Sequence, residues 1–181
     1  MLPKDGLLVV NWDDENCRAI TKNTEAKAVT YAIESQNANF VARNIVFNDN
    51  GFPTFDVYYN NNFFKTISLS VPGRHNVLNA LACIAVCNEY GIDREDIKNA
   101  LHKYTGAHRR FEFKGCFDGV NVFDDYGHHP TEILATANAL KQKKYNESWV
   151  IFQPHTYSRT KNLLDDFAKA LLNFDNIIIF Q

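Results

Sequence analysis

The sequence has no apolar run near the roughly 18 residues that a helix needs to cross a lipid bilayer. Its longest apolar runs, residues 7–10 and 177–180, have the length of strands. Near the start there is also no basic segment followed by an apolar run of signal-peptide length. These absences exclude a membrane-spanning protein and predict a cytoplasmic one.

The sequence also lacks an excess of either charge. Its 19 basic and 21 acidic residues give a formal net charge of −2. Without a large cationic field, the protein has no general attraction for nucleic acid or anionic lipid, so any anion-binding site must be local. We therefore expect neither nucleic acid nor a membrane as a partner.

No pair of the four cysteines has the C-x-x-C spacing of a redox or zinc motif. Cys83 and Cys87 stand one helical turn apart among apolar residues. This pattern predicts reduced, buried thiols rather than a disulfide framework.

Several motifs that would identify an enzyme class are absent. The sequence contains no G-x-x-x-x-G-K-[ST] phosphate-binding loop and no Gly-Lys pair, so it cannot cradle a nucleoside triphosphate in that manner. It also contains no G-x-S-x-G, H-E-x-x-H or G-x-G-x-x-G motif. The hydrolase, zinc-peptidase and dinucleotide-binding classes therefore have no support.

What is present is the composition of a folded globular protein, with 45% hydrophobic and 22% charged residues. The first third of the chain is rich in strand patterns. The sequence NNN at residues 60–62 predicts a hairpin turn, because asparagine tolerates left-handed backbone conformations. The expected strands are residues 7–11, 28–33, 40–47, 55–59 and 63–69, with a short helix at 15–22.

Two helices are predicted in the middle of the chain. Residues 75–90 are apolar almost all round and are followed by Gly91, a typical helix stop, so we expect a buried helix. Asp93 is the expected N-cap of a second helix, in which apolar residues recur at helical spacing as far as Tyr104.

The last third alternates between strands and helices, which favours parallel βαβ units and an α/β fold. We expect one domain at residues 1–106 and a second at 107–181. Because the chain ends directly after a strand, we expect the second domain to be truncated. The expected strands are 111–117, 120–124, 149–153 and 177–180, and the expected helices are 130–143 and 163–172.

The segment DDYGHHP at residues 124–130 places two carboxylates, a phenol and two imidazoles between a strand and a helix. Ligands of open α/β sheets bind at the carboxyl ends of strands, and a helix start at Pro130 favours anions. Alternatively, Asp124 caps a turn, His129 caps the helix and the other side chains face water. A metal site is least favoured, because adjacent strand residues point to opposite faces.

The segment QPHTYSRT at residues 153–160 repeats this arrangement, with Thr160 as the expected cap of the next helix. Both strand ends are expected at one edge of a parallel sheet, where His128, His155 and Arg159 can converge. Arg159 can then bind a carboxylate through two hydrogen bonds. The alternative, and the commoner case for one arginine, is a solvated surface position.

His75, Asn76 and Asn79 fall in the first turns of the helix expected to be buried, with the two amides on one face. Asparagine amides offer the paired donor and acceptor that suit adenine. Capping of the helix start is the alternative. Arg110 belongs to a basic pair beside Phe111. Such a pair can bind a phosphate or can simply lie on the protein surface.

In order and spacing, four segments resemble the Mur ligase family: residues 73–80 (GRHNVLNA), 109–111 (RRF), 124–132 (DDYGHHPTE) and 153–160. The sequences LPKDG at 2–6 and NWDDEN at 11–16 are similar to the family's central domain, so the resemblance covers essentially the whole chain. It implies the C-terminal part of a central ATP-binding domain, followed by the first half of a Rossmann-like domain that brings the amino acid.

The resemblance implies an ATP-dependent, amide-bond-forming ligase of peptidoglycan synthesis. Residues 153–160 are most similar to the members that join L-alanine to UDP-N-acetylmuramate through an acyl phosphate. Mg²⁺ is also implied, with its ligands and the phosphate-loop lysine expected outside this sequence, so we expect the chain alone to be inactive. Two alternatives stay open: a sister ligase that adds a peptide or another amino acid, and a fragment that only binds nucleotide.

The resemblance also assigns roles residue by residue. The residues implied on the nucleotide side are His75, Asn76, Asn79, Arg110 and Asp125; those implied to orient the amino acid and the muramoyl carboxylate are Tyr126, His128, His155 and Arg159; and those implied in catalysis are Arg110 and His128. Arg110 is implied to stabilise the transferring phosphoryl group, and Asp125 to bind the ribose hydroxyls.

Overall fold

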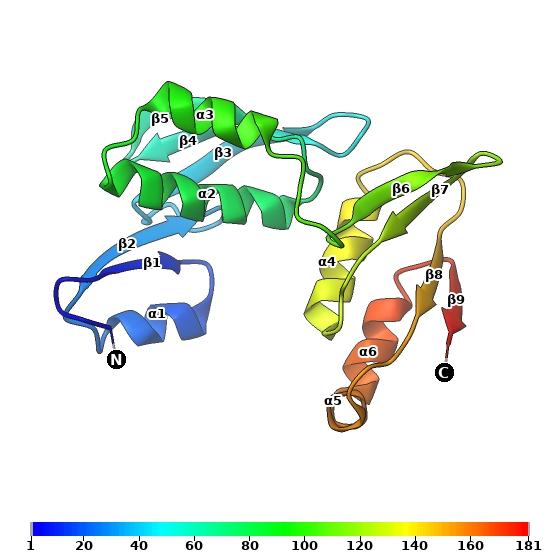
Figure 1. Cartoon of the computed structure of the whole chain (residues 1–181). Helices are drawn as coiled ribbons and strands as arrows, with labels where there is room; N and C mark the ends of the chain where they lie inside the picture. The colour runs from blue at the N-terminus through cyan, green and yellow to red at the C-terminus, as the bar shows by residue number, and fades with distance from the viewer. Residues whose placement is uncertain (1, 181) are drawn as a thin grey trace. The chain divides into compact units, whose positions relative to one another are not determined.

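The structure is a computed structural model that describes residues 2–180. It confirms an α/β protein (Figure 1) and divides into two compact units. The first unit comprises residues 2–48 and Phe52–Thr105, and the second comprises Asp49–Gly51 and residues 106–180. Among the residues described, no helix has the length and apolar character needed to cross a membrane.

The first unit is built on a five-stranded sheet with the order β1-β2-β3-β4-β5. The first three strands are parallel to one another, and β4 and β5 are antiparallel to their neighbours. The strands are β1 (Leu7–Asn11), β2 (Lys27–Ala32), β3 (Phe40–Phe47), β4 (Pro53–Tyr59) and β5 (Asn62–Ser68). All five were predicted. The hairpin turn is confirmed as well, because Asn60 and Asn61 have φ angles of 48° and 64°.

Three helices accompany this sheet: α1 (Glu15–Thr21), α2 (Arg74–Glu89) and α3 (Arg94–Lys103). Helix α2 packs on strands β1 to β4, and α3 packs on β5 (Figure 1). Gly91 follows α2 with a φ of +71°, as expected of a helix stop. Asp93 caps α3 as predicted, accepting a hydrogen bond from the N–H of Glu95 at 2.8 Å.

The prediction that α2 is a buried helix is correct for one face only. One face packs into the core through Val77, Leu81 and Ile84, while Val86 is 39% exposed. The reason is that the sheet covers one side of the helix. The core beneath it is centred on Phe40, which is fully buried and stacks on Tyr59 with ring centroids 4.6 Å apart.

The four cysteines are free thiols, as predicted, but they are not buried. Cys83 and Cys116 are exposed, and Cys17 and Cys87 are partly buried. The burial prediction fails for Cys83 because the residue lies on the outer side of α2. The Cys83 and Cys87 sulfur atoms lie 4.0 Å apart.

The second unit contains two separate two-stranded sheets, β6-β7 and β8-β9. Their strands are β6 (Glu112–Phe117), β7 (Val120–Asp124), β8 (Trp149–Phe152) and β9 (Asn176–Ile179). The β8-β9 pair is parallel, as predicted for a βαβ unit, and β6-β7 is an antiparallel hairpin. Asp118 and Gly119 have φ angles of 48° and 82°, which suit the tight two-residue turn of this hairpin.

The helices of this unit are α4 (Pro130–Leu140), α5 (Tyr157–Asn162) and α6 (Leu164–Leu171). The prediction that Thr160 caps a helix is wrong. Thr160 lies inside α5, and its hydroxyl donates to the carbonyl oxygen of Thr156 at 3.3 Å. Helix α6 packs against α4, and Phe167 fills a small core with Ile133 and Phe152.

Candidate functional site

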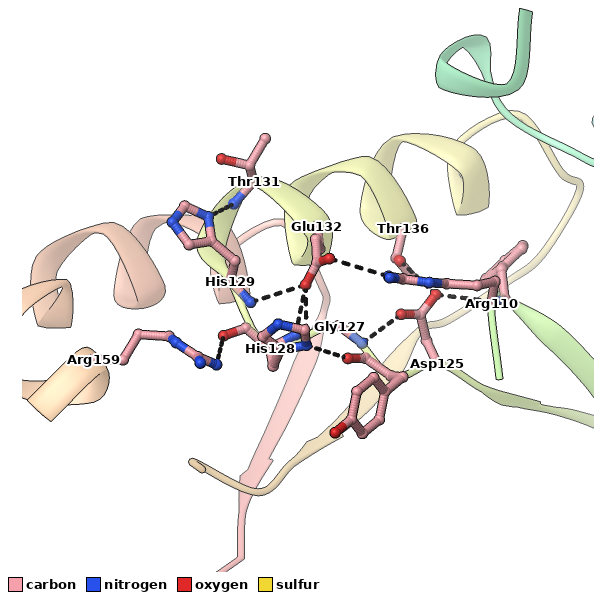
Figure 2. A network of polar contacts seen from close by, with 11 residues as sticks. Arg110, Asp125, Gly127, His128, His129, Thr131, Glu132, Thr136 and Arg159 are labelled. Atoms are coloured by element: carbon pink, nitrogen blue, oxygen red, sulfur yellow. Dashed lines mark hydrogen bonds and ion pairs between the residues drawn. The ribbon is translucent and has the colours of Figure 1, made fainter. Parts of the chain in front are cut away.

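Asp125 anchors the turn between β7 and α4 through three hydrogen bonds (Figure 2). Its Oδ1 accepts from the N–H of Gly127 at 2.7 Å, and its Oδ2 accepts from the N–H of Phe111 and the hydroxyl of Thr136, both at 2.9 Å. A carboxylate has about four acceptor positions. About one position therefore remains for a ligand hydroxyl.

Glu132, in the first turn of α4, connects two parts of this site (Figure 2). Its Oε2 accepts from the backbone N–H groups of His128 and His129, at 2.9 and 3.2 Å, and its Oε1 accepts from Arg110 Nη1 at 3.2 Å. The side chain of His129 accepts in turn from the N–H of Thr131 at 3.3 Å, which completes a capping box. Of that alternative, the part in which His129 caps the helix is thus confirmed.

The surroundings of Glu132 keep its carboxylate ionised. Partial burial works to raise the pKa of Glu132, but the hydrogen bonds from the His128 N–H and the Arg110 guanidinium outweigh it. The pKa therefore lies below the ordinary value of a glutamate. At neutral pH the Glu132 carboxylate is therefore negatively charged beside the positive charge of Arg110.

His128 is held by its neighbours on both sides. Its Nδ1 lies 3.0 Å from the carbonyl oxygen of Tyr126, and the two rings meet edge to face at 5.2 Å. Arg159 reaches the same residue from α5, donating from Nη1 to the His128 carbonyl oxygen at 3.1 Å (Figure 2). The guanidinium of Arg109 lies over the Tyr126 ring at 4.8 Å.

Five of the predicted site residues are therefore brought together: Arg110, Asp125, Tyr126, His128 and Arg159. His155 is not among them. Its Nδ1 lies 3.3 Å from the hydroxyl of the adjacent Thr156, and within residues 2–180 it makes no hydrogen bond or ion pair with the other five. The predicted route of convergence is also wrong, because the strands before the two segments belong to different sheets. Arg159 reaches His128 through its long side chain instead.

The remaining predicted residues lie on α2 in the first unit. The Nδ2 of Asn79 donates to Oδ1 of Asn76 at 3.0 Å, so the two amides share a face as expected. The Nδ2 of Asn76 donates to the carbonyl oxygen of Pro72 at 2.8 Å. The N-cap is Gly73, with no side-chain cap. Capping therefore does not explain the two asparagines, and His75 lies in the same first turn.

Two residues of the network were missed from sequence. Glu132 stands three positions after His129, which is the spacing of a capping box, but histidine is not among the usual N-cap residues. Thr136 stands one helical turn after Glu132, on the same face of α4. Its hydrogen bond to Asp125 joins residues 11 positions apart, and no local sequence pattern predicts such a bond.

The carboxylate of Glu112, the first residue of β6, makes the stability of the neighbouring backbone depend on pH. Its carboxylate accepts from the N–H of Arg109 at 2.8 Å and from Lys114 Nζ at 3.0 Å, and these bonds lower its pKa from 4.5 to about 2. A lowered folded-state pKa stabilises the protein above the unfolded value, and this stabilisation is lost as the pH falls toward the folded value.

We therefore expect Glu112→Gln to lower the free energy of unfolding at pH 6, and we expect this difference to vanish between about pH 4.5 and about pH 2. Denaturant unfolding of both proteins across this range measures the difference. Glu147→Gln, an exposed carboxylate of the same unit, controls for the loss of one charge. A difference that stays constant down to pH 2 would contradict the assignment.

Comparison with family models places both units in one family. The model described as "Mur ligase middle domain" matches residues 1–87. The model described as "Mur ligase, glutamate ligase domain" matches residues 109–181.

Curated relatives match the chain over its whole length. The UDP-N-acetylmuramate–L-alanine ligase of Acetivibrio thermocellus is 46% identical over 179 residues, covering 99% of this chain and 38% of the relative. The ligase of the same name from Clostridium beijerinckii is 47% identical, covering 100% of this chain and 39% of the relative. The chain thus spans well under half the length of these relatives.

Solved structures of ligases with related names are also similar to this chain. The crystal structure of UDP-N-acetylmuramate–alanine ligase from Thermotoga maritima is 30% identical with a TM-score of 0.72, over 90% of this chain and 39% of that chain. The crystal structure of MurF from Acinetobacter baumannii is 22% identical with a TM-score of 0.79, over 100% of this chain and 43% of that chain, and shows the shared fold.

Proposed function

This chain belongs to the Mur ligase family, and we propose that it is part of an ATP-dependent ligase that joins L-alanine to UDP-N-acetylmuramate in peptidoglycan synthesis. The observation that carries the proposal is the 46% identity over 99% of the chain with a relative named for that reaction. Because the chain covers 38% of that relative, the activity is proposed for the longer protein.

We propose that residues 1–106 are the C-terminal part of the central ATP-binding domain and that residues 107–181 begin the Rossmann-like domain that brings the amino acid. The family models support this division, since the first ends at residue 87 and the second begins at residue 109. A cytoplasmic location is proposed as well, because the nucleotide substrates of such a reaction are found there.

The proposed reaction has two steps. The carboxylate oxygen of UDP-N-acetylmuramate attacks the γ-phosphorus of ATP, which releases ADP and forms an acyl phosphate. The amino group of L-alanine then attacks the acyl carbon, and phosphate leaves as the amide forms, with loss of a proton from nitrogen. Each step builds negative charge on phosphoryl or acyl oxygens, and fixed hydrogen-bond donors stabilise such charge.

On the nucleotide side, we propose that His75, Asn76 and Asn79 contact the adenine and that Asp125 accepts a ribose hydroxyl. The paired Asn76 and Asn79 amides and the remaining acceptor position of Asp125 support these roles. Arg110 is proposed to stabilise the transferring phosphoryl group. Its side chain is 49% exposed beyond the bond to Glu132, so donors remain available.

On the amino-acid side, we propose that Arg159 binds a substrate carboxylate and that Tyr126 and His128 orient the reacting groups, with His128 also taking part in catalysis. The bond from Arg159 to the His128 carbonyl supports a common site for them. His155 stays a proposal on the family resemblance alone, because its contact is with Thr156.

The residues described here offer no ready place for the implied Mg²⁺. They contain no group of three or more His, Cys, Asp or Glu side chains suited to a metal ion. When bound elsewhere in the longer protein, Mg²⁺ would neutralise charge on the phosphates of ATP.

The test is phosphate release by the full-length protein supplied with ATP, Mg²⁺ and UDP-N-acetylmuramate, with and without L-alanine. Release that depends on L-alanine is the expected result. Parallel reactions with glycine, D-glutamate or a peptide in place of L-alanine serve as controls. Release that requires one of these instead of L-alanine would assign the protein to a sister ligase.

A further inference from the structure

We propose that Glu132 is a positioning residue for phosphoryl transfer. From the first turn of α4, its carboxylate holds the guanidinium of Arg110 in place and also binds the backbone N–H of His128. This inference rests on the role of Arg110 in the proposed function. Glu132 lies 22 positions after Arg110 in the sequence, and the two side chains meet at 3.2 Å.

The two carboxylate oxygens of Glu132 have separate partners (Figure 2). Oε1 accepts from Arg110 Nη1, and Oε2 accepts from the N–H groups of His128 and His129. A carboxylate is rigid and planar, so the position of the guanidinium is tied to that of the His128 backbone. Loss of the hydrogen bond to Arg110 leaves the His128 backbone in place but removes this coupling.

The backbone around Arg110 is also fixed. Arg109 and Phe111 both have positive φ angles, of 56° and 46°, which non-glycine residues rarely adopt. The Arg109 carbonyl accepts from the N–H of Tyr126 at 2.8 Å, and the Phe111 N–H donates to Asp125 at 2.9 Å. The backbone of Arg110 is therefore held on both sides. Its side chain can still rotate, and the bond to Glu132 restricts that rotation.

The anchored arginine is still open to a ligand. Glu132 takes one of five guanidinium N–H donors, and the side chain is 49% exposed. Arg109 does not compete for this position, because its Nε donates to Asp124 at 3.3 Å. A guanidinium that is held at one edge and exposed at the other is preorganised for an anionic transition state.

The substitution Glu132→Gln separates this role from helix capping. Capping boxes accept Glu or Gln, so the amide oxygen that the substitution introduces can still accept from the His128 and His129 N–H groups. The new NH₂ group then faces the Arg110 guanidinium, and two donors cannot bond to each other. The variant therefore keeps the helix start and breaks the bond to Arg110; it also removes the negative charge that lies 3.4 Å from His128 Nδ1, an effect that the cycle with Arg110→Ala separates.

The experiment measures L-alanine-dependent phosphate release by full-length Glu132→Gln protein. We expect kcat to fall on the order of 10- to 100-fold, the KM for L-alanine to change by less than about threefold, and the melting temperature to shift by less than about 4 °C. Glu147→Gln, the exposed control in the same unit, should leave kcat unchanged. A raised KM with unchanged kcat would indicate capping alone and would overturn the inference.

A double-mutant cycle with Arg110→Ala gives a second readout. If Glu132 acts through Arg110, adding Glu132→Gln to Arg110→Ala should lower kcat by less than about twofold further. Effects that multiply would overturn the inference. Glu132→Asp is the second variant, should Gln prevent folding: it keeps the charge, is one methylene too short to span both partners, and should also lose kcat.

These outcomes distinguish the inference from the proposed function. A wild-type protein without L-alanine-dependent release refutes the proposed function and this inference together. An active wild-type protein whose kcat is unaffected by Glu132→Gln refutes only the positioning role.

Discussion

Replacement of Asp125 by alanine is expected to lower L-alanine-dependent phosphate release, measured as kcat/KM in the full-length protein, by about a thousandfold or more. Two losses combine in this variant. A hydrogen bond to a charged group contributes about 1.5–3 kcal/mol, and this is the proposed bond to the ribose. The Phe111 N–H and the Thr136 hydroxyl also lose their acceptor, which frees the backbone next to Arg110. Together they reach roughly 4 kcal/mol, or a factor of a thousand.

Thr136→Val is the matched control for this experiment. It removes one of the three donors to Asp125 and leaves the carboxylate, the Gly127 bond and the Phe111 bond in place. We expect it to lower kcat/KM by less than about tenfold, in line with roughly 1 kcal/mol for one neutral hydrogen bond. An Asp125→Ala protein that keeps more than a tenth of the wild-type activity would remove Asp125 from the nucleotide site.

Local patterns were sufficient to predict most elements. The strands of the first unit alternate or cluster apolar residues over lengths that only strands have, and Asp93 and Gly91 bound their helices by the chemistry of caps and stops. The Asp118-Gly119 turn carried an equally strong signal for a hairpin. In the same unit, the expectation of one parallel sheet for the strands before residues 124–130 and 153–160 was wrong, because β7 and β8 belong to different sheets.

Long-range contacts of the site could not be predicted in the same way. The motif at residues 124–130 predicted a candidate site, but the bond from Asp125 to Phe111 spans 14 residues and that from Arg110 to Glu132 spans 22. Such bonds depend on how the hairpin returns to the start of α4. Sequence spacing placed Arg159 near His128 for the wrong reason, a shared sheet, and the structure achieves the contact with one long side chain.

Phe40→Ala is expected to have the largest effect on stability, about 3–5 kcal/mol, which is the usual cost of removing a buried phenylalanine. The side chain is fully buried in the middle of the first sheet. It also stacks on Tyr59 and meets Phe64 edge to face at 5.8 Å, and each such pair contributes about 0.5–1.5 kcal/mol beyond burial. A loss of this size is a large part of the roughly 5–15 kcal/mol that stabilises a domain.

Fluorescence of Trp12 can follow this loss in the first unit alone, because the only other tryptophan, Trp149, lies in the second unit and can be replaced by phenylalanine. Phe63→Ala is the matched control: it makes the same change on β5 at a side chain that is 56% exposed, and should cost less than about 1 kcal/mol. Equal losses in the two variants would show that burial at Phe40 is not what stabilises the sheet. Because Val77 and Leu81 of α2 share the core with Phe40, the larger loss should also loosen the helix that carries Asn76 and Asn79.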